Sequence, residues 1–153
     1  MKSFVVIGLG RFGTAVATEL AKLGHEVLAI DRNEAAVANV APLVTCAVTA
    51  DGQSMDVLRS LGVANYECGV VALSDDIGNS ALIALTLKEI GVKRVICKAQ
   101  NHVHRKLLEK IGVDRIVFPE YEMGVKLAQN LTSANMLNFI ALTEKYGIVE
   151  TVV

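Results

Sequence analysis

Short apolar runs alternate with longer amphipathic segments along most of the chain. Six runs read as β-strands: Phe4–Gly8, Val27–Asp31, Val44–Thr49, Gly69–Ser74, Val95–Gln100 and Ile116–Phe118. The segments between them place apolar residues at helical spacing. Strands that alternate with helices through short links pair in parallel by right-handed crossovers. The pattern therefore predicts an α/β, Rossmann-like, doubly wound parallel sheet with the strand order 3-2-1-4-5-6.

The ends of the predicted helices carry recognisable signals. Four helices close on a large aliphatic residue followed by glycine, which tolerates the left-handed conformation that ends a helix. These pairs are Leu23-Gly24, Leu61-Gly62, Ile90-Gly91 and Ile111-Gly112. Asn33 and Ser54 stand at the expected N-cap positions of two further helix starts.

The end of the chain follows a different pattern. Glu122–Leu131 predicts a helix, residues 135–142 form an apolar segment, and residues 148–153 predict a strand. Six strands complete a doubly wound domain by about residue 120. We therefore expect a nucleotide-binding core over residues 1–120. Residues 121–153 would form a crossover helix and the start of a C-terminal lobe that is truncated or missing.

A glycine-rich turn follows the first predicted strand. Gly8 permits a tight turn, Gly10 lets the backbone approach a phosphate, and Gly13 lets the next helix pack closely on the sheet. The start of that helix attracts an anion. Asp31, at the end of the second strand, is placed to accept hydrogen bonds from ribose hydroxyls, or to help cap the helix after it. A carboxylate there disfavours the 2′-phosphate of NADP, although the neighbouring Arg32 weakens that preference.

Arg11 and Phe12 occupy variable positions of the turn, and both are candidate nucleotide-binding residues. The Arg11 guanidinium is always charged and can contact two phosphate oxygens at once. A dehydrogenase needs no charge at this position, because backbone amides bind the pyrophosphate. A terminal phosphate, or a phosphate held by a neighbouring subunit, would use one. The alternative is a solvated arginine at the rim of the site.

Further candidates lie at the carboxyl ends of the other strands, where open α/β sheets bind ligands. Asp51 is placed to accept from an adenine amino group or to cap the helix that starts near Ser54. Ser74 begins a polar segment that contacts the ligand or caps the following helix, and Lys98 lies near the end of the fifth strand. Glu120 is either a surface residue or a carboxylate that recruits Mg²⁺ or Ca²⁺ near phosphates.

The composition fits one domain with buried parallel strands. Of the 153 residues, 52% are hydrophobic and 5% aromatic, and this aliphatic richness suits strands covered by helices on both faces. The formal net charge is −1, which argues against a nucleic-acid partner. No apolar run approaches the roughly 18 residues that a membrane span needs. We therefore expect no direct insertion into a membrane.

The cysteines and histidines give no sign of a catalytic or metal site. The sequence has three of each, namely Cys46, Cys68 and Cys97, and His25, His102 and His104. The cysteines lack CxxC spacing and are interpreted as small core residues in a reducing cytosol. The two histidines that share a predicted helix face different directions. We expect all three histidines to be exposed rather than catalytic, and the chain not to be an enzyme.

Four stretches of the sequence together resemble the RCK (KTN, TrkA-N) domain family. They are residues 6–13, 24–31, 92–101 and 108–120. Within that family the chain is most similar to the cytosolic regulatory subunits of Ktr-type potassium transporters. The resemblance implies a nucleotide-sensing subunit that gates a potassium channel or transporter, binds ATP or ADP, and alternatively binds NAD or NADH. It also implies homodimers that assemble into an octameric ring, located in the cytoplasm beneath a membrane-embedded potassium channel subunit.

The resemblance also implies roles for single residues. The phosphate turn would be Gly8, Gly10 and Gly13, and the ribose acid Asp31. Arg11 would reach the terminal phosphate of ATP bound in the neighbouring subunit. Glu120 would bind a divalent cation, Mg²⁺ or Ca²⁺, between paired ATP sites. Phe118 departs from the His or Ser that often precedes this proline in the family, and we expect that change to matter little.

Two alternatives stay open. A small NAD(P)-dependent oxidoreductase would need a substrate pocket and an acid–base group, usually from a second domain or a long insertion, and every link here is short. An NAD(H) redox sensor would signal through occupancy by that dinucleotide instead of ATP. The sequence does not rank the affinities, because the adenosine phosphate common to these ligands makes the same contacts in each.

Overall fold

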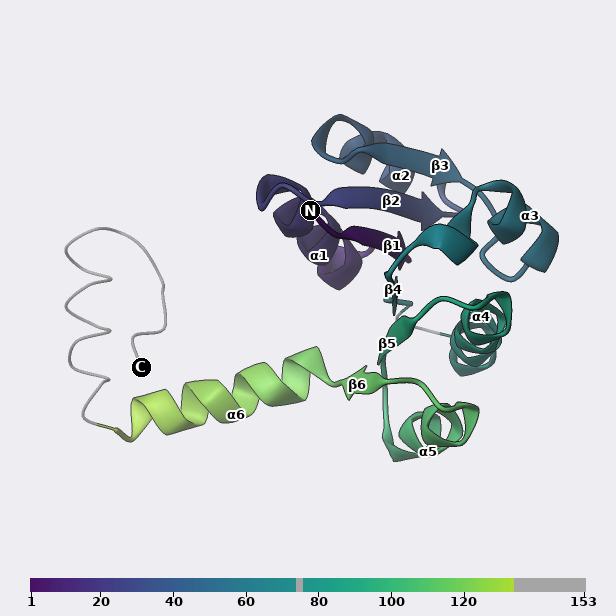
Figure 1. Cartoon of the computed structure of the whole chain (residues 1–153). Coiled ribbons are helices and arrows are strands. Elements are labelled where there is room, and N and C mark those ends of the chain that lie inside the picture. Colours follow the sequence, from purple (N-terminus) through teal and green to yellow (C-terminus); the bar gives the residue numbers. More distant parts are fainter. Residues whose placement is uncertain (74–75, 134–153) are drawn as a thin grey trace. The chain divides into compact units, whose positions relative to one another are not determined.

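The structure is a computed structural model that describes residues 1–73 and 76–133. The chain divides into two units, residues 1–117 and residues 118–153. Ser74 and the predicted segments at residues 135–142 and 148–153 lie outside the described residues. The first unit holds a six-stranded parallel sheet in the order β3-β2-β1-β4-β5-β6 (Figure 1). The predicted fold class and strand order are confirmed.

The elements of the first unit alternate along the chain. The strands are β1 Ser3–Ile7, β2 Glu26–Asp31, β3 Cys46–Thr49, β4 Cys68–Val71, β5 Arg94–Lys98 and β6 Arg115–Val117. The helices are α1 Arg11–Lys22, α2 Glu34–Val40, α3 Met55–Ser60, α4 Ile77–Ile90 and α5 His102–Ile111, with short 3-10 helices η1 at Ala41–Leu43 and η2 at Val63–Asn65. The second unit contains α6, Pro119–Leu131, which begins before the predicted start at Glu122.

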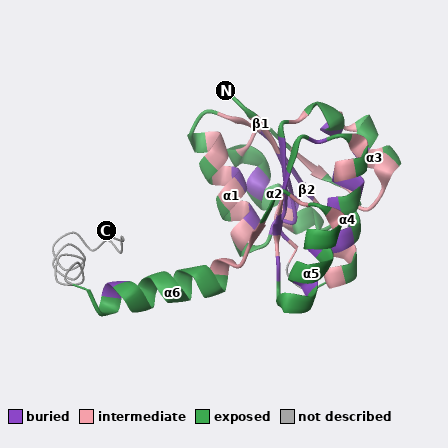
Figure 2. Ribbon diagram, turned by 60° about the horizontal axis from the view of Figure 1, so that its bottom comes forward, coloured by how far each residue is buried: buried purple, intermediate pink, exposed green. Residues whose placement is uncertain are grey.

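Helices cover both faces of the sheet (Figure 2). Successive strand residues point to opposite faces, so Val6 packs with α1 and α2 on one face. On the other face α4 comes so close that a side chain at Gly69 would contact Leu87. Strands β1, β2, β4 and β5 supply most of the fully buried apolar residues. The central strands of this core end in the predicted site.

The predicted helix signals are confirmed. The Asn33 side chain accepts hydrogen bonds from the Ala35 and Ala36 amides at 2.9 and 3.1 Å, and Ser54 Oγ accepts from the Val57 amide at 3.3 Å. All four glycines that were expected to follow a helix end have positive φ, namely Gly24, Gly62, Gly91 and Gly112. These local signals fix where the chain turns back toward the next strand.

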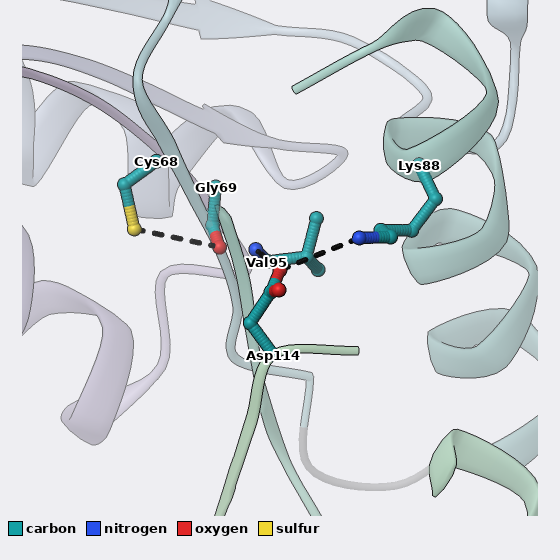
Figure 3. A network of polar contacts seen from close by, with 5 residues as sticks. All are labelled: Cys68, Gly69, Lys88, Val95 and Asp114. Atoms are coloured by element: carbon teal, nitrogen blue, oxygen red, sulfur yellow. Dashed lines mark hydrogen bonds and ion pairs between the residues drawn. The ribbon is translucent and has the colours of Figure 1, made fainter. Parts of the chain in front are cut away.

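Asp114 links β5 and β6 at the amino ends of the strands, whereas the predicted site lies at their carboxyl ends (Figure 3). Its Oδ2 accepts from the Val95 amide at 2.7 Å and pairs with Lys88 Nζ at 3.5 Å. Its own amide donates to the Val95 carbonyl at 2.8 Å. These bonds link the start of β5 to the residue before β6 and to α4, and so hold the two outer strands in register.

One cysteine departs from the prediction. Cys68 and Cys97 are buried, as expected, but Cys46 is exposed. Cys46 opens β3, the edge strand of the sheet. Its neighbour Ala47 packs on the core, so Cys46 points to the opposite face at the margin of the sheet. Burial raises the pKa of the Cys97 thiol to about 11.

The prediction that His104 is exposed is wrong. Its side chain is fully buried, whereas His102 on the same helix is exposed. Nδ1 of His104 accepts from the Gln100 amide at 3.1 Å, and Nε2 lies 3.2 Å from Ser80 Oγ. Ser80 Oγ in turn lies 3.7 Å from Cys97 Sγ. A buried polar chain therefore joins α5, α4 and β5, and the cost of burying the imidazole is offset by its two partners.

Candidate functional site

The glycine turn after β1 is as tight as the sequence predicts. Gly8 has a φ of +101°, and a Cβ there would lie 2.9 Å from the backbone carbon of Ala72. A Cβ on Gly13 would overlap the Gly8 carbonyl oxygen. Side chains at these two positions would push α1 away from the sheet, so glycine is required for the helix to start here.

The start of α1 is open to an anion. Gly10 is its N-cap residue, no side chain of the described residues caps it, and its first turn holds no acidic residue. By contrast, side chains cap the starts of the other four helices of this unit. Arg11 stands at the first helical position and is exposed. Backbone N–H groups, the helix dipole and the guanidinium thus bring positive charge together at one point.

Asp31 is fixed against this turn by backbone hydrogen bonds. Its Oδ2 accepts from the Leu9 amide at 2.7 Å, and its Oδ1 accepts from the Asn33 amide at 2.8 Å. Each carboxylate oxygen has a second lone pair, so the side chain can still accept from a ligand. The bond to Asn33 also shows that Asp31 shapes the start of α2, so its two expected roles are compatible.

A cavity of about 40 Å³ lies beside Asp31, where β1 and β4 end. Its lining includes Gly8, Asp31, Arg32, Gly52 and Asn79, together with apolar side chains of β1 and α4. The strand order reverses between these two strands, and this switch point is where doubly wound sheets bind ligands. The structure thus brings Gly8, Asp31 and Arg32 of the predicted set around one space.

Lys98 reaches the turn from the end of β5. Its Nζ lies 5.9 Å from the centroid of the Phe12 ring, a cation–π distance. Phe12 is the second residue of α1, so this contact places a second basic group beside the helix start. Both residues belong to the predicted set, and the structure brings them together.

The structure does not test the ligand contacts predicted for Asp51 and Ser74. Asp51 is exposed, and its Oδ1 accepts from the Gln53 amide at 2.9 Å, ahead of the Ser54 cap of α3. Ser74 lies outside the described residues, and the capping alternative of its segment is confirmed at Asp76, which accepts from the Asn79 amide at 3.0 Å. The ligand contacts of Asp51 and Ser74 stay predictions.

Glu120 belongs to the first turn of α6 in the second unit. In that unit the Phe118 amide donates to a Glu122 carboxylate oxygen at 2.7 Å and so fixes the helix start. Within the described parts of the chain, no three His, Cys, Asp or Glu side chains gather as a metal site. The expected role of Glu120 as a metal ligand therefore rests on the sequence alone.

Sequence reasoning missed Asn79, which lines the cavity from α4. It stands inside a helix, where an asparagine is usually taken for a surface residue. The signal available was its distance from the strand end, because the first turn of a helix after a central strand faces the switch point.

None of the helices in the described part of the chain has the length and apolar character of a membrane span.

The chain is similar to known potassium uptake proteins. The Ktr system potassium uptake protein A of Bacillus subtilis is 50% identical over 149 residues, which are 97% of this chain and 67% of that protein. The Ktr system potassium uptake protein A of Vibrio alginolyticus is 38% identical over 152 residues, 99% of this chain and 69% of the relative.

Solved structures of low identity show the same fold. The TrkA-N domain of the inner membrane protein ybaL from Escherichia coli has a TM-score of 0.77 at 13% identity, covering 86% of this chain and 97% of that one. The GsuK RCK domain has a TM-score of 0.71 at 23% identity, covering 91% and 30% respectively. The family model of the TrkA-N domain matches residues 4–119. Because this match covers most of the chain, the chain belongs to the TrkA-N domain family.

Proposed function

We propose that this chain is a nucleotide-sensing regulatory subunit of a potassium transport system and acts by binding rather than catalysis. The observation that carries the proposal is the open start of α1, with Asp31 held beside it by the Leu9 amide. Similarity to two Ktr potassium uptake proteins supports the link to potassium transport. Solved GsuK structures of the same fold, bound to NAD and to ADP, support a nucleotide as the ligand.

In this proposal Arg11 distinguishes ATP from ADP. A ligand shifts a conformational equilibrium only by its difference in affinity for the two states. The γ-phosphate is the difference between ATP and ADP, so a residue that contacts it carries the signal. Arg11 is exposed at the helix start, and in this proposal it contacts the terminal phosphate of ATP bound in the neighbouring subunit. Glu120, with Mg²⁺ or Ca²⁺, would complete the site.

The proposal includes assembly of copies of this chain, as a homodimer and then an octameric ring, against a membrane-embedded potassium channel subunit at the cytoplasmic face. Four large apolar side chains are exposed on the neighbouring helices α4 and α5 (Figure 2). They are Leu82, Leu85, Val103 and Leu107. Large exposed apolar patches mark interaction sites, so exposed apolar side chains on two adjacent helices support an interface there.

The test is calorimetric titration with ATP, ADP, NAD⁺ and NADH, each with and without Mg²⁺ or Ca²⁺. The wild type is expected to bind ATP and ADP, with a cation effect on ATP. Arg11→Ala should lose most of its preference for ATP and keep its affinity for ADP. Arg59→Ala, a change at another exposed arginine, is the control.

Three results would contradict the proposal. An unchanged ratio of ATP to ADP affinity in Arg11→Ala would remove the sensing role of this residue. Tight binding of NAD⁺ or NADH without binding of ATP would favour the redox sensor. NADH oxidation with a small carbonyl substrate would favour the oxidoreductase.

A further inference from the structure

Asn79 carries an unusual polar atom. Among the side chains that the structure describes, its Oδ1 is buried and has no hydrogen-bond partner. Buried polar atoms are satisfied in the great majority of cases, because an unpaired acceptor forfeits the hydrogen bonds it makes in water. An exception at a half-buried residue such as Asn79 therefore needs a reason, and its position supplies one.

This unpaired acceptor, the orphan acceptor, belongs to a residue that lines the cavity beside Asp31 at the switch point of the sheet. Asn79 stands in the first turn of α4, and its amide donates to Asp76 Oδ1, which fixes the backbone. The lining of this cavity also includes two glycines, Gly8 and Gly52. A Cβ on Gly52 would lie 2.9 Å from the Ile7 side chain. Close packing therefore requires glycine at both positions, and the room for a ligand atom is the cavity itself.

The second polar wall of this cavity is also an acceptor. Asp31 is a carboxylate whose bonds to the Leu9 and Asn33 amides leave lone pairs available. Arg32 is the basic residue of the lining, and it is exposed. Two acceptors against one apolar-walled space select a group that presents hydrogen-bond donors. In a nucleotide these donors belong to the nucleoside, as base amino or sugar hydroxyl groups, because the phosphates carry acceptors.

We propose that Asn79 is a nucleoside-binding residue, whose side-chain carbonyl accepts a hydrogen bond from a neutral donor of the bound nucleotide. The inference rests on the proposed function and adds to it a residue that contacts the nucleoside, whereas Arg11 contacts the phosphates. The donor is either the amino group of adenine or a hydroxyl of ribose, and ligand analogues distinguish the two.

The test combines protein variants with ligand analogues in calorimetric titrations. Wild type and Asn79→Leu are titrated with ADP, inosine diphosphate, 2′-deoxy-ADP and 3′-deoxy-ADP. Asn79→Leu should bind ADP about tenfold more weakly, which is the effect of one lost hydrogen bond. For the analogue without the relevant donor, wild type and variant should bind equally. Asn65→Leu, on the exposed surface, controls for the substitution itself.

Thermal unfolding without nucleotide gives a second readout. If Asn79 serves the ligand, Asn79→Leu removes a buried orphan acceptor, and Tm stays the same or rises. If Asn79 serves the fold, Tm falls. Asn79→Asp keeps an acceptor of the same shape, so it should retain the wild-type discrimination between ADP and the critical analogue even if the added charge weakens all four ligands.

The outcomes separate this inference from the proposed function. A wild type that binds none of the four diphosphates overturns the proposed function, and this inference with it. A wild type that binds ADP alongside an Asn79→Leu variant of equal affinity overturns the inference alone. So does an affinity loss of the same size for all four ligands, because it would mean that Asn79 does not contact the nucleoside.

Discussion

Gly13 is the residue at which the turn and α1 approach most closely. A Cβ there would overlap the Gly8 carbonyl oxygen, and that oxygen belongs to backbone that cannot rotate away. We predict that Gly13→Ala lowers the free energy of unfolding by about 1–3 kcal/mol, the usual cost of overpacking. Urea unfolding would measure it. Gly78→Ala is the control, because its Cβ would meet only Asp76 Oδ1, at 3.6 Å. Equal stabilities of the two variants would contradict the prediction.

Single residues also show how far the sequence could be read. The tasks of Gly8 and Gly13 followed from the motif, because a turn this tight leaves no choice of residue. The sequence predicted that Lys98 and Phe12 belong to the same site, but it did not predict the contact between them. The orphan acceptor of Asn79 could not be predicted, since it depends on the atoms around it and not on any spacing along the chain.

At the scale of elements, strand order and helix ends were predictable because local rules determine them. Strands that alternate with helices through short links pair by parallel crossovers, and short polar caps and glycines mark most of the helix boundaries in the first unit. Burial on α5 was not predictable in the same way. Only packing against α4 and β5 decides that His104, and not His102, contacts Ser80, which in turn contacts Cys97. The exposure of Cys46 likewise depends on β3 being an edge strand with little cover on one face.

The buried chain through α5 makes stability depend on pH. Because Nδ1 of His104 accepts from the Gln100 amide, the neutral ring carries its proton on Nε2, facing Ser80. An imidazolium would turn an N–H toward that amide. Burial lowers the pKa of His104 below its ordinary value. As the pH falls below about 6.5, the unfolded chain therefore takes up a proton that the folded chain does not.

We predict that this network costs stability in mild acid. The free energy of unfolding should fall by up to about 1.4 kcal/mol per pH unit below pH 6.5, until the folded imidazole also protonates. His104→Asn removes this contribution and should flatten the slope. His102→Asn removes an imidazole from the exposed side of the same helix and is the control. Urea unfolding between pH 5 and 7.5 measures the slopes, and identical slopes for the two variants would refute the prediction.

At the scale of the whole molecule, the exposed large apolar side chains of the first unit lie mostly on two helices. Leu82 and Leu85 share one side of α4, and Val103 and Leu107 share one side of α5, by their helical spacing. The two helices are neighbours, joined through the buried bond between His104 and Ser80. A patch made of these four side chains on two packed helices suits the repeated contacts of a symmetric assembly.

We predict that this patch joins copies of the chain. The wild type should show a mass above that of one chain in size-exclusion chromatography with light scattering. Leu82→Glu combined with Val103→Glu places two charges in the patch and should lower that mass, because burying unpaired charge in an interface is costly. Leu23→Glu changes an exposed leucine at the end of α1 and is the control. A wild type with the mass of one chain would contradict the prediction, as would a double variant with the mass of the control. Circular dichroism would verify that all variants keep the fold.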